Sequence, residues 1–290
     1  MIFWLNGDYK ENPMAIDIAD RGFLLGDGVF ETLLVEGGVP AFLDAHLERL
    51  KNSLIALSIN VAPLDNIGDV IAGLAEKNGL GSVIASARIT ITRGRSDRGL
   101  LFSASGPAAP TLLVTLMRAS NNTEDSPIIL KLSRSVRCEE SIASQHKTTN
   151  YLDNILARNE AEAAGVDEAI MLNSRGRVAC ASSANIFVIK ENGDVLTPPC
   201  ADGALNGIVR GLLLGCVAQT GVAISEAPVD LALLQRGAPF LTNSLTGLRQ
   251  ARLKDDGPAP IALQVEIFNQ LETWYQDRLH RSLTESAPAP

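Results

Sequence analysis

One lysine, Lys147, stands in a context that suits chemistry better than solvation. It lies in SQHKTTNYLDNILARNE, residues 144–160, in a chain with 7 lysines and 18 arginines. A lysine is ordinarily a solvated surface charge, but this one precedes a predicted amphipathic helix. We expect the apolar residues Leu152, Ile155 and Leu156 to pack that helix against a core. The positive end of a helix dipole disfavours a protonated amine, and a neutral amine can form a Schiff base, so Lys147 is a candidate nucleophile.

Two further segments carry groups that bind anions. LNGIVR, residues 205–210, predicts a helix N-terminus whose backbone N–H groups and dipole favour a phosphate. RGRSDRG, residues 93–99, presents guanidinium groups, which bind carboxylates in a bidentate manner. Taken alone, the first segment is equally an ordinary capped helix and the second a solvated basic loop. GDG at 26–28 does not predict a nucleotide loop, because the strand-like GVFETLLV follows it instead of a helix.

The elements that must position these groups form two α+β domains. The first reads as strands, then helices, then strands, with turns at the NG of WLNGDY and the GG of GVFETLLVEGGVPAF. Helices are predicted at 44–58, where Leu47, Leu50, Leu54 and Leu57 have helical spacing, and from Pro63 to near Gly79. In the second, hairpins at NSRG and ENGD precede a helix from Asn206 to Gly221, and a last helix spans roughly 262–280. We therefore expect an N-terminal domain over 1–118, a linker at 119–127, a C-terminal domain over 128–283 and a disordered tail at 284–290. The active site is expected in the interdomain cleft.

Composition excludes several classes of function. The chain has 290 residues, 46% of them hydrophobic, and a net charge of −8. This acidic balance argues against a nucleic-acid-binding protein, and no apolar run is long enough to span a membrane. The four cysteines are widely spaced, so we expect a reducing cytoplasmic location with no disulfide framework and no metal site.

Seven sequence blocks, in order, resemble the fold-type IV enzymes that use pyridoxal 5'-phosphate (PLP). These are the class IV aminotransferases and the 4-amino-4-deoxychorismate lyases. The blocks are DRGFLLGDGVFETL, HLERL, ITRGRSDRG, KTTNYL, SSANIF, LNGIVR and TNSLTG. The resemblance covers nearly the whole chain and implies the two-domain fold of D-amino-acid aminotransferases. It also implies a homodimer with shared active sites, in which the RGRSDRG loop reaches the neighbouring subunit.

The resemblance assigns roles to individual residues. Lys147 matches the lysine that forms the Schiff base with PLP, and Arg98 matches the arginine that holds a substrate carboxylate. In branched-chain enzymes a tyrosine hydroxyl hydrogen-bonds the cofactor's 3-oxygen. Tyr151 falls near that position, but it is one residue closer to the lysine than the tyrosine of those enzymes. Phosphate-binding groups are implied at Arg49, Gly207, Ile208, Val209 and Ser244. Leu205 matches the residue that packs on the pyridine ring, and we place Phe30 and Asn243 among the substrate contacts.

The motifs favour a lyase but leave other reactions open. The spacing RGxxxRG, the valine in LNGIVR and the pattern TNSLTG are more typical of the lyases, which eliminate pyruvate to give 4-aminobenzoate. Leu100 stands where D-amino-acid aminotransferases have a histidine. A branched-chain or D-amino-acid aminotransferase is the alternative, and a PLP-binding protein with weak or no catalysis is a third. All three would bind a small amino-carboxylate.

One residue departs from the family pattern. A glutamate normally stands five residues before the asparagine of SSANIF, and here that position is Cys180. The glutamate keeps the pyridine nitrogen protonated, which makes the ring a strong electron sink. A thiol does this poorly, so we predict that Cys180 contacts the nitrogen and disfavours fast transamination. The alternative is that a slip of one or two residues in this matching, or another acidic group such as Glu31, supplies the missing carboxylate.

Overall fold

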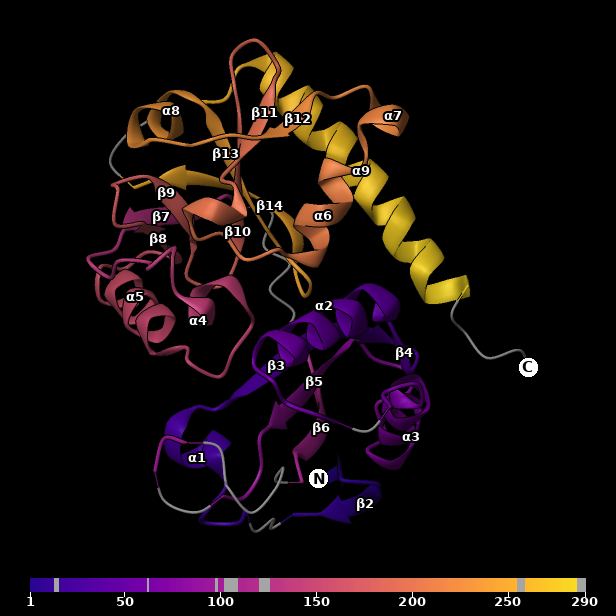
Figure 1. The fold of residues 1–290 in the computed structure, drawn as a ribbon. Helices are drawn as coiled ribbons and strands as arrows, with labels where there is room; N and C mark the ends of the chain where they lie inside the picture. Colours follow the sequence, from indigo (N-terminus) through magenta and orange to yellow (C-terminus); the bar gives the residue numbers. More distant parts are fainter. Residues whose placement is uncertain are drawn as a thin grey trace. The chain divides into compact units, whose positions relative to one another are not determined.

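The computed structural model describes residues 1–12, 16–61, 63–96, 99–101, 109–119, 126–254 and 259–285. The chain divides into two compact units (Figure 1). Unit 1 comprises Met1–Asn121, Lys147–Asn150 and Leu279–Pro290, and unit 2 comprises Asn122–His146 and Tyr151–Arg278. The division near residue 121 falls inside the expected linker, most of which lies outside the described residues. One difference from the expected boundaries concerns the site, because Lys147–Asn150 group with the N-terminal part of the chain.

Unit 1 is a mixed α and β structure built on one antiparallel sheet. Its elements are β1 (Ile2–Leu5), β2 (Asp8–Glu11), α1 (Arg21–Leu25), β3 (Gly28–Glu36), β4 (Val39–Pro40), α2 (Leu43–Ala56), α3 (Ile67–Lys77), β5 (Ala85–Thr92) and β6 (Thr111–Arg118). The strand order is β2-β1-β6-β5-β3-β4. Leu47, Leu50 and Leu54 of α2 are buried at helical spacing, as predicted, and with residues of α3 and the strands they form the core of the unit.

The hairpins of unit 1 follow from their turn residues. Asn6 and Gly7 have φ values of 48° and 106° between β1 and β2, a conformation that Asn and Gly adopt easily. The GG turn between β3 and β4 likewise has positive φ at Gly37 and Gly38. The two predicted hairpins are therefore confirmed, and β3 lies between β5 and β4 in the sheet.

Unit 2 contains the second sheet. Its elements are β7 (Ile128–Leu132), α4 (Ile142–Gln145), α5 (Leu152–Ala163), β8 (Glu168–Leu172), β9 (Val178–Ala181), β10 (Asn185–Ile189), β11 (Val195–Thr197), a 3-10 turn (Cys200–Asp202), α6 (Ile208–Leu214), α7 (Val217–Thr220), β12 (Ile224–Glu226), α8 (Leu231–Arg236), β13 (Ala238–Asn243), β14 (Gly247–Leu253) and α9 (Ala262–Glu285). The strand order is β12-β11-β10-β13-β14-β7-β8-β9. The hairpins predicted at NSRG and ENGD join β8 to β9 and β10 to β11.

Two expectations about helices in unit 2 need correction. The segment expected to form one helix from Asn206 to Gly221 forms α6 and α7, with Gly215 and Cys216 between them. Glycine inside a helical pattern weakens it, which accounts for the break. The last helix is longer than expected, because α9 continues to Glu285 into the residues expected as a tail.

None of the helices in the described ranges is both long enough and apolar enough to cross a membrane. The four cysteines are free thiols, of which Cys180 and Cys216 are buried.

The core of unit 1 generates a stability prediction. Leu33 of β3 is fully buried, with 0% exposure. Leu33→Ala should lower the free energy of unfolding by about 3 kcal/mol, because it removes apolar contacts and leaves a cavity. Urea denaturation followed by circular dichroism measures this loss. The control is Ile55→Ala on α2, where the side chain is 75% exposed and the change should stay within about 0.5 kcal/mol. Equal effects of the two variants would contradict this assignment of the core.

Candidate active site

Lys147 is held by backbone pairing with the start of β3. The Phe30 amide donates to the Lys147 carbonyl at 2.9 Å, and the Thr149 amide donates to the Gly28 carbonyl at 2.9 Å. The Thr149 hydroxyl adds a bond of 2.6 Å to the Gly26 carbonyl. The Lys147 Nζ lies 4.4 Å from the centroid of the Phe30 ring. The lysine is thus half-buried against an aromatic face, with its backbone fixed on both sides.

The expected packing of the neighbouring helix is wrong. Leu152, Ile155 and Leu156 of α5 are 66%, 53% and 49% exposed. The buried face of α5 carries Ala157 and Ala161, which pack on strand residues of unit 2. Small residues let the helix backbone approach the sheet closely, and the larger side chains then point outward. Lys147 is therefore positioned by its pairing with β3 and not by burial of the helix that follows it.

Arg49 of α2 is fixed by the carboxylate of Glu31, which lies on β3 next to Phe30. Its Nε donates to Glu31 Oε1 at 2.8 Å, and a terminal nitrogen donates to Oε2 at 2.6 Å. His46, one turn earlier on α2, places Nδ1 2.6 Å from the same Oε2. Glu31 and His46 are fully buried, whereas the Arg49 side chain keeps 12% exposure. The arrangement holds a guanidinium at the edge of a buried carboxylate–imidazole pair.

The charge states of this cluster follow from its contacts. Burial alone would raise the pKa of Glu31, but hydrogen bonds from Arg49 and His46 lower it to about 2. Burial lowers the pKa of His46 despite the neighbouring carboxylate. Glu31 is thus ionised and His46 neutral at pH 7. Both oxygens of Glu31 are already bonded, which removes the reason to assign Glu31 as the substitute for the glutamate missing at Cys180.

The RGRSDRG loop begins with a structural arginine. Arg93 Nε and Arg21 Nε donate to Asp27 Oδ2 at 2.8 and 2.7 Å. Burial would raise the pKa of Asp27, but these two arginines hold it below its usual range. Arg21 also donates to the Gly99 carbonyl at 2.9 Å, so it ties the far end of the loop to the same carboxylate. Arg98, the expected substrate-binding arginine, lies outside the described residues.

In unit 2, Asn185 joins several of the predicted cofactor residues. It pairs with Thr242 between β10 and β13, and its side-chain amide donates to the Leu205 carbonyl at 2.8 Å. A Cβ atom on Gly207 would lie 2.0 Å from Asn185 Oδ1, so only glycine fits there. Asn185 therefore brings the LNGIVR turn beside the end of β13.

The groups that could bind a phosphate in unit 2 lie at this same end of the sheet. Gly207, not Asn206, is the N-cap of α6, and no side chain caps the helix. Ile208 and Val209 are buried, so their backbone amides are the groups they can offer. Ser244 lies in the β13–β14 turn, where Asn243 Oδ1 accepts from the amides of Leu245 and Thr246, both at 2.9 Å. Asn243 thus shapes the turn that carries Ser244.

Cys180 lies at the end of β9, where that strand turns toward β10. The residue is 5% exposed, and its backbone pairs with that of Met171 on β8. Burial raises the pKa of the thiol, so it is protonated at neutral pH. Cys180 is therefore a neutral group in the position where the resemblance expects a carboxylate.

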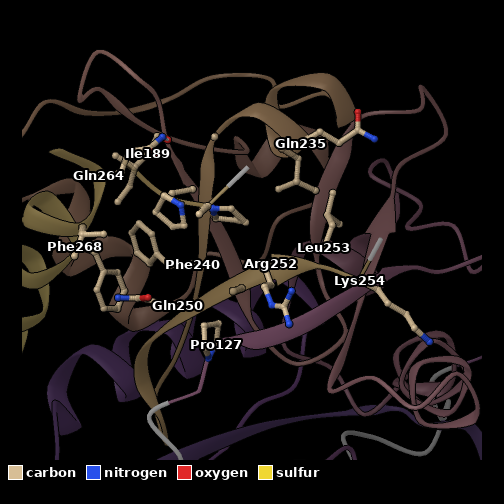
Figure 2. A pocket seen from close by; sticks show the side chains of 18 residues that line it. Pro127, Ile189, Gln235, Phe240, Gln250, Arg252, Leu253, Lys254, Gln264 and Phe268 are labelled. Carbon is tan, nitrogen blue, oxygen red and sulfur yellow. The ribbon is translucent and has the colours of Figure 1, made fainter. Parts of the chain in front are cut away.

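One pocket of unit 2 gathers residues of this end of the sheet. Tyr151, Ser182, Ser183, Glu168 and Asn243 line it, so two predicted residues, Tyr151 and Asn243, share one concave surface. A second pocket, drawn in Figure 2, is lined by Phe240, Phe268 and Arg252 among others. It lies at the opposite end of the β13–β14 hairpin, and its described lining includes none of the predicted site residues.

The residues present fit a phosphate-bearing aldehyde cofactor. The start of α6 has no side-chain cap, so the backbone N–H groups of its first turn are donors of the kind that bind a phosphate, and the close packing of Gly207 on Asn185 fixes the position of that turn. Lys147 supplies an amine and Arg49 a fixed guanidinium. Glu31, His46 and Asn185 support these groups; the sequence reasoning considered Glu31 only as an alternative carboxylate for the ring nitrogen and gave His46 and Asn185 no role. The HLERL and SSANIF blocks contained two of them, but nothing in a single sequence shows that their side chains meet other elements.

Comparison with known proteins gives a consistent result. Residues 28–253 match the family described as amino-transferase class IV. A protein of Methanocaldococcus jannaschii, provisionally named a branched-chain-amino-acid aminotransferase, is 32% identical over 80% of each chain. The aminodeoxychorismate lyase of Bacillus subtilis is 30% identical over 84% of this chain and 83% of its own. The crystal structure of 4-amino-4-deoxychorismate lyase from Pseudomonas aeruginosa has a TM-score of 0.80 and 28% identity, covering 95% of this chain and 98% of that one.

The buried Glu31 cluster generates a pH prediction. The folded-state pKa of Glu31, about 2, is below its ordinary 4.5, so its contribution to stability is present above about pH 4.5 and is lost as pH falls toward 2. The difference of about 2.5 pH units corresponds to roughly 3 kcal/mol. Glu31→Gln should flatten this acid limb when urea unfolding of the cofactor-free protein is measured between pH 5 and 2. Glu36→Gln, at the exposed end of β3, is the control and should leave the limb unchanged. An identical acid limb in all three proteins would contradict the assignment.

Proposed function

Because the chain belongs to the class IV aminotransferase family of PLP-dependent enzymes, we propose that it uses Lys147 and PLP to eliminate pyruvate from 4-amino-4-deoxychorismate. The observation that carries the catalytic part is the geometry of Lys147, whose backbone is paired with β3 and whose amine lies over Phe30. The lyase part is supported by the B. subtilis relative and by the TNSLTG and RGxxxRG patterns. A branched-chain aminotransferase is the second candidate, supported by the M. jannaschii relative.

Each group of the site has a task in this proposal. Arg49, Ser244 and the amides of Ile208 and Val209 bind the phosphate of PLP. Leu205 packs on the ring, Tyr151 faces the 3-oxygen, and Cys180 faces the ring nitrogen. Phe30 and Asn243 contact the substrate, and Arg98 holds a substrate carboxylate. When bound, PLP supplies an electrophilic carbonyl and an electron-accepting ring.

The proton chemistry belongs to Lys147. Lys147 would hold the cofactor through its amine, and once substrate is bound that amine would be available beside Phe30 to move a proton. That amine then takes the proton from the substrate carbon that bears nitrogen. In the lyase, loss of this proton is followed by departure of pyruvate and formation of the aromatic ring of 4-aminobenzoate. In an aminotransferase, Lys147 would instead return the proton to the cofactor carbon, so the two reactions share their first steps.

We also propose that the protein is a homodimer in which the RGRSDRG loop of each subunit completes the active site of the other. We propose a cytoplasmic location for it. Each unit displays apolar side chains that a monomer would leave in water. In unit 1, Phe23 and Leu24 of α1 are 69% and 56% exposed. In unit 2, Leu152 and Ile155 of α5 are similarly exposed. Such groups are typical of surfaces that another subunit covers.

The lysine assignment is tested by Lys147→Ala. Wild-type protein should show the absorption band of a PLP Schiff base and should release pyruvate and 4-aminobenzoate from aminodeoxychorismate. Lys147→Ala should lose the band and reduce turnover by at least about 1,000-fold, since the amine that forms the bond and moves the proton is gone. Lys131→Ala, at an exposed position of β7, is the control. Turnover with amino acids and keto acids, without pyruvate release, would favour the aminotransferase instead.

The shared site is tested by mixing two inactive subunits. Lys147→Ala lacks the amine and Arg98→Ala lacks the proposed carboxylate-binding group. If Arg98 acts in the partner's site, a mixed dimer contains one site with both residues intact, and refolding the variants together should restore about a quarter of the wild-type activity. Each variant refolded alone is the control. A fully active monomer in light scattering, or no recovery on mixing, would contradict this arrangement.

A further inference from the structure

Arg137 is a buried cation whose partners are neutral. It is 7% exposed and lies on the segment before α4 in unit 2. Its guanidinium donates to the carbonyls of Gly203 and Ser144 at 3.3 and 2.6 Å and to Asn154 Oδ1 at 3.2 Å. Among the residues that the structure describes, no carboxylate forms an ion pair with it. A buried guanidinium with only carbonyl partners leaves its positive charge to act on its surroundings.

Arg137 lies beside the strand that carries Cys180. Its backbone bridges to Asn173, at the start of the β8–β9 hairpin. A Cβ on Gly203 would lie 3.0 Å from Arg137 Cγ and 3.5 Å from Ala179 Cβ, so Arg137 and the residue before Cys180 pack around the same glycine. Asn154 extends the contact, because its amide donates to the Ser182 carbonyl at 2.8 Å, two residues after Cys180. The charge of Arg137 also lowers the pKa of the buried thiol, against the larger effect of burial.

The other charged groups near Cys180 are already balanced. Glu168 accepts from the Ser182 hydroxyl, from Ser183 Oγ at 2.6 Å and from two amides, and it lies 3.7 Å from Arg158. Two more buried carboxylates of this region are also paired. They are Asp202, paired with Arg177 at 3.4 Å, and Glu139, paired with Arg175 at 3.3 Å. Arg137 is therefore the buried charge near Cys180 that no carboxylate among the described residues pairs with.

We propose that Arg137 is a positioning residue that, with the neutral Cys180, keeps the ring nitrogen of PLP unprotonated. This inference rests on the proposed function, in which Cys180 faces that nitrogen. A nearby positive charge disfavours a second positive charge on the ring, so Arg137 should lower the pKa of the ring nitrogen by about 1–3 units. Asn154 holds the guanidinium in place, and the carbonyls of Gly203 and Ser144 keep it buried without a carboxylate. The ring then accepts less charge from the substrate carbon, which favours departure of a leaving group over reprotonation at the cofactor.

The test is ¹⁵N NMR of protein loaded with PLP labelled at the ring nitrogen, because protonated and neutral pyridine nitrogens have well-separated chemical shifts. The wild-type resonance should be that of a neutral nitrogen at pH 7. Cys180→Glu should move it to the protonated position. Asn154→Asp places a carboxylate on Arg137 and should raise the nitrogen pKa by about 1 unit, although it also removes the amide that donates to the Ser182 carbonyl. Asn159→Asp, exposed on the same helix, is the matched control and should behave as wild type.

If Asn154→Asp does not fold, Arg137→Gln is used in its place. This variant removes the positive charge but keeps a hydrogen-bond donor, and it should also raise the pKa of the ring nitrogen. A protonated nitrogen in wild-type protein at pH 7, with the Lys147 Schiff base present, would overturn the inference and leave the proposed function intact. A neutral wild-type nitrogen that responds to Cys180→Glu, but to neither Asn154→Asp nor Arg137→Gln, would overturn the role of Arg137. Failure to form any Schiff base, shown by no incorporation of PLP at Lys147 after borohydride reduction, would instead contradict the proposed function.

Discussion

The hydrogen bond between the Phe30 amide and the Lys147 carbonyl is the contact on which the candidate site of unit 1 depends. It brings a segment from the middle of the chain to the start of β3, so that one strand presents the reactive amine and its aromatic neighbour. The next residue on that strand, Glu31, holds Arg49. Asp27, just before the strand, binds Arg93 and so fixes the root of the loop that carries Arg98. A single nine-residue strand therefore sets the positions of the Lys147 amine, the Arg49 guanidinium and the start of the RGRSDRG loop, the groups to which we assign cofactor and substrate binding in the proposed function.

In unit 2 the candidate site residues are positioned by one side chain, that of Asn185, whereas in unit 1 they are positioned by strand β3. Asn185 is the first residue of β10, and its amide bonds to the Leu205 carbonyl while its oxygen packs against Gly207. Because β10 pairs with β13, this one residue also sets the distance from the α6 start to the turn that carries Ser244. The site thus needs glycine at 207 for steric reasons, independent of any ligand. The glycine in LNGIVR has a structural explanation and a chemical one, and the two reinforce each other.

The sequence predicted the elements well where pattern and local turn chemistry agree. The leucines of α2, the NG and GG hairpins and the last helix all follow from spacing and composition. The prediction failed for α5, where the face with the large apolar residues was expected to be buried. An apolar face predicts burial only when the opposite face is polar, and here the opposite face carries Ala157 and Ala161, which pack more closely on the sheet. The candidate residues were identified from sequence motifs, whereas supporting residues such as His46 and Arg137 contact partners that are distant in the sequence. Those contacts are tertiary and leave no local signal.

Similarity to relatives does not by itself separate the two reactions, since the relatives named for an aminotransferase and for a lyase are 32% and 30% identical to this chain. In the proposed function both reactions begin at Lys147, so the residues of those first steps do not distinguish them. In the proposed site, where Cys180 faces the ring nitrogen, the choice between them depends on groups that change the ring without disturbing the fold. Position 180 meets this condition because Arg137 is satisfied by the carbonyls of Gly203 and Ser144 and by Asn154. A buried cation that relied on residue 180 for its partner would make any change there strongly destabilising. Since it does not, a carboxylate can be replaced by a thiol, and the electronic character of the cofactor can change while the structure stays folded.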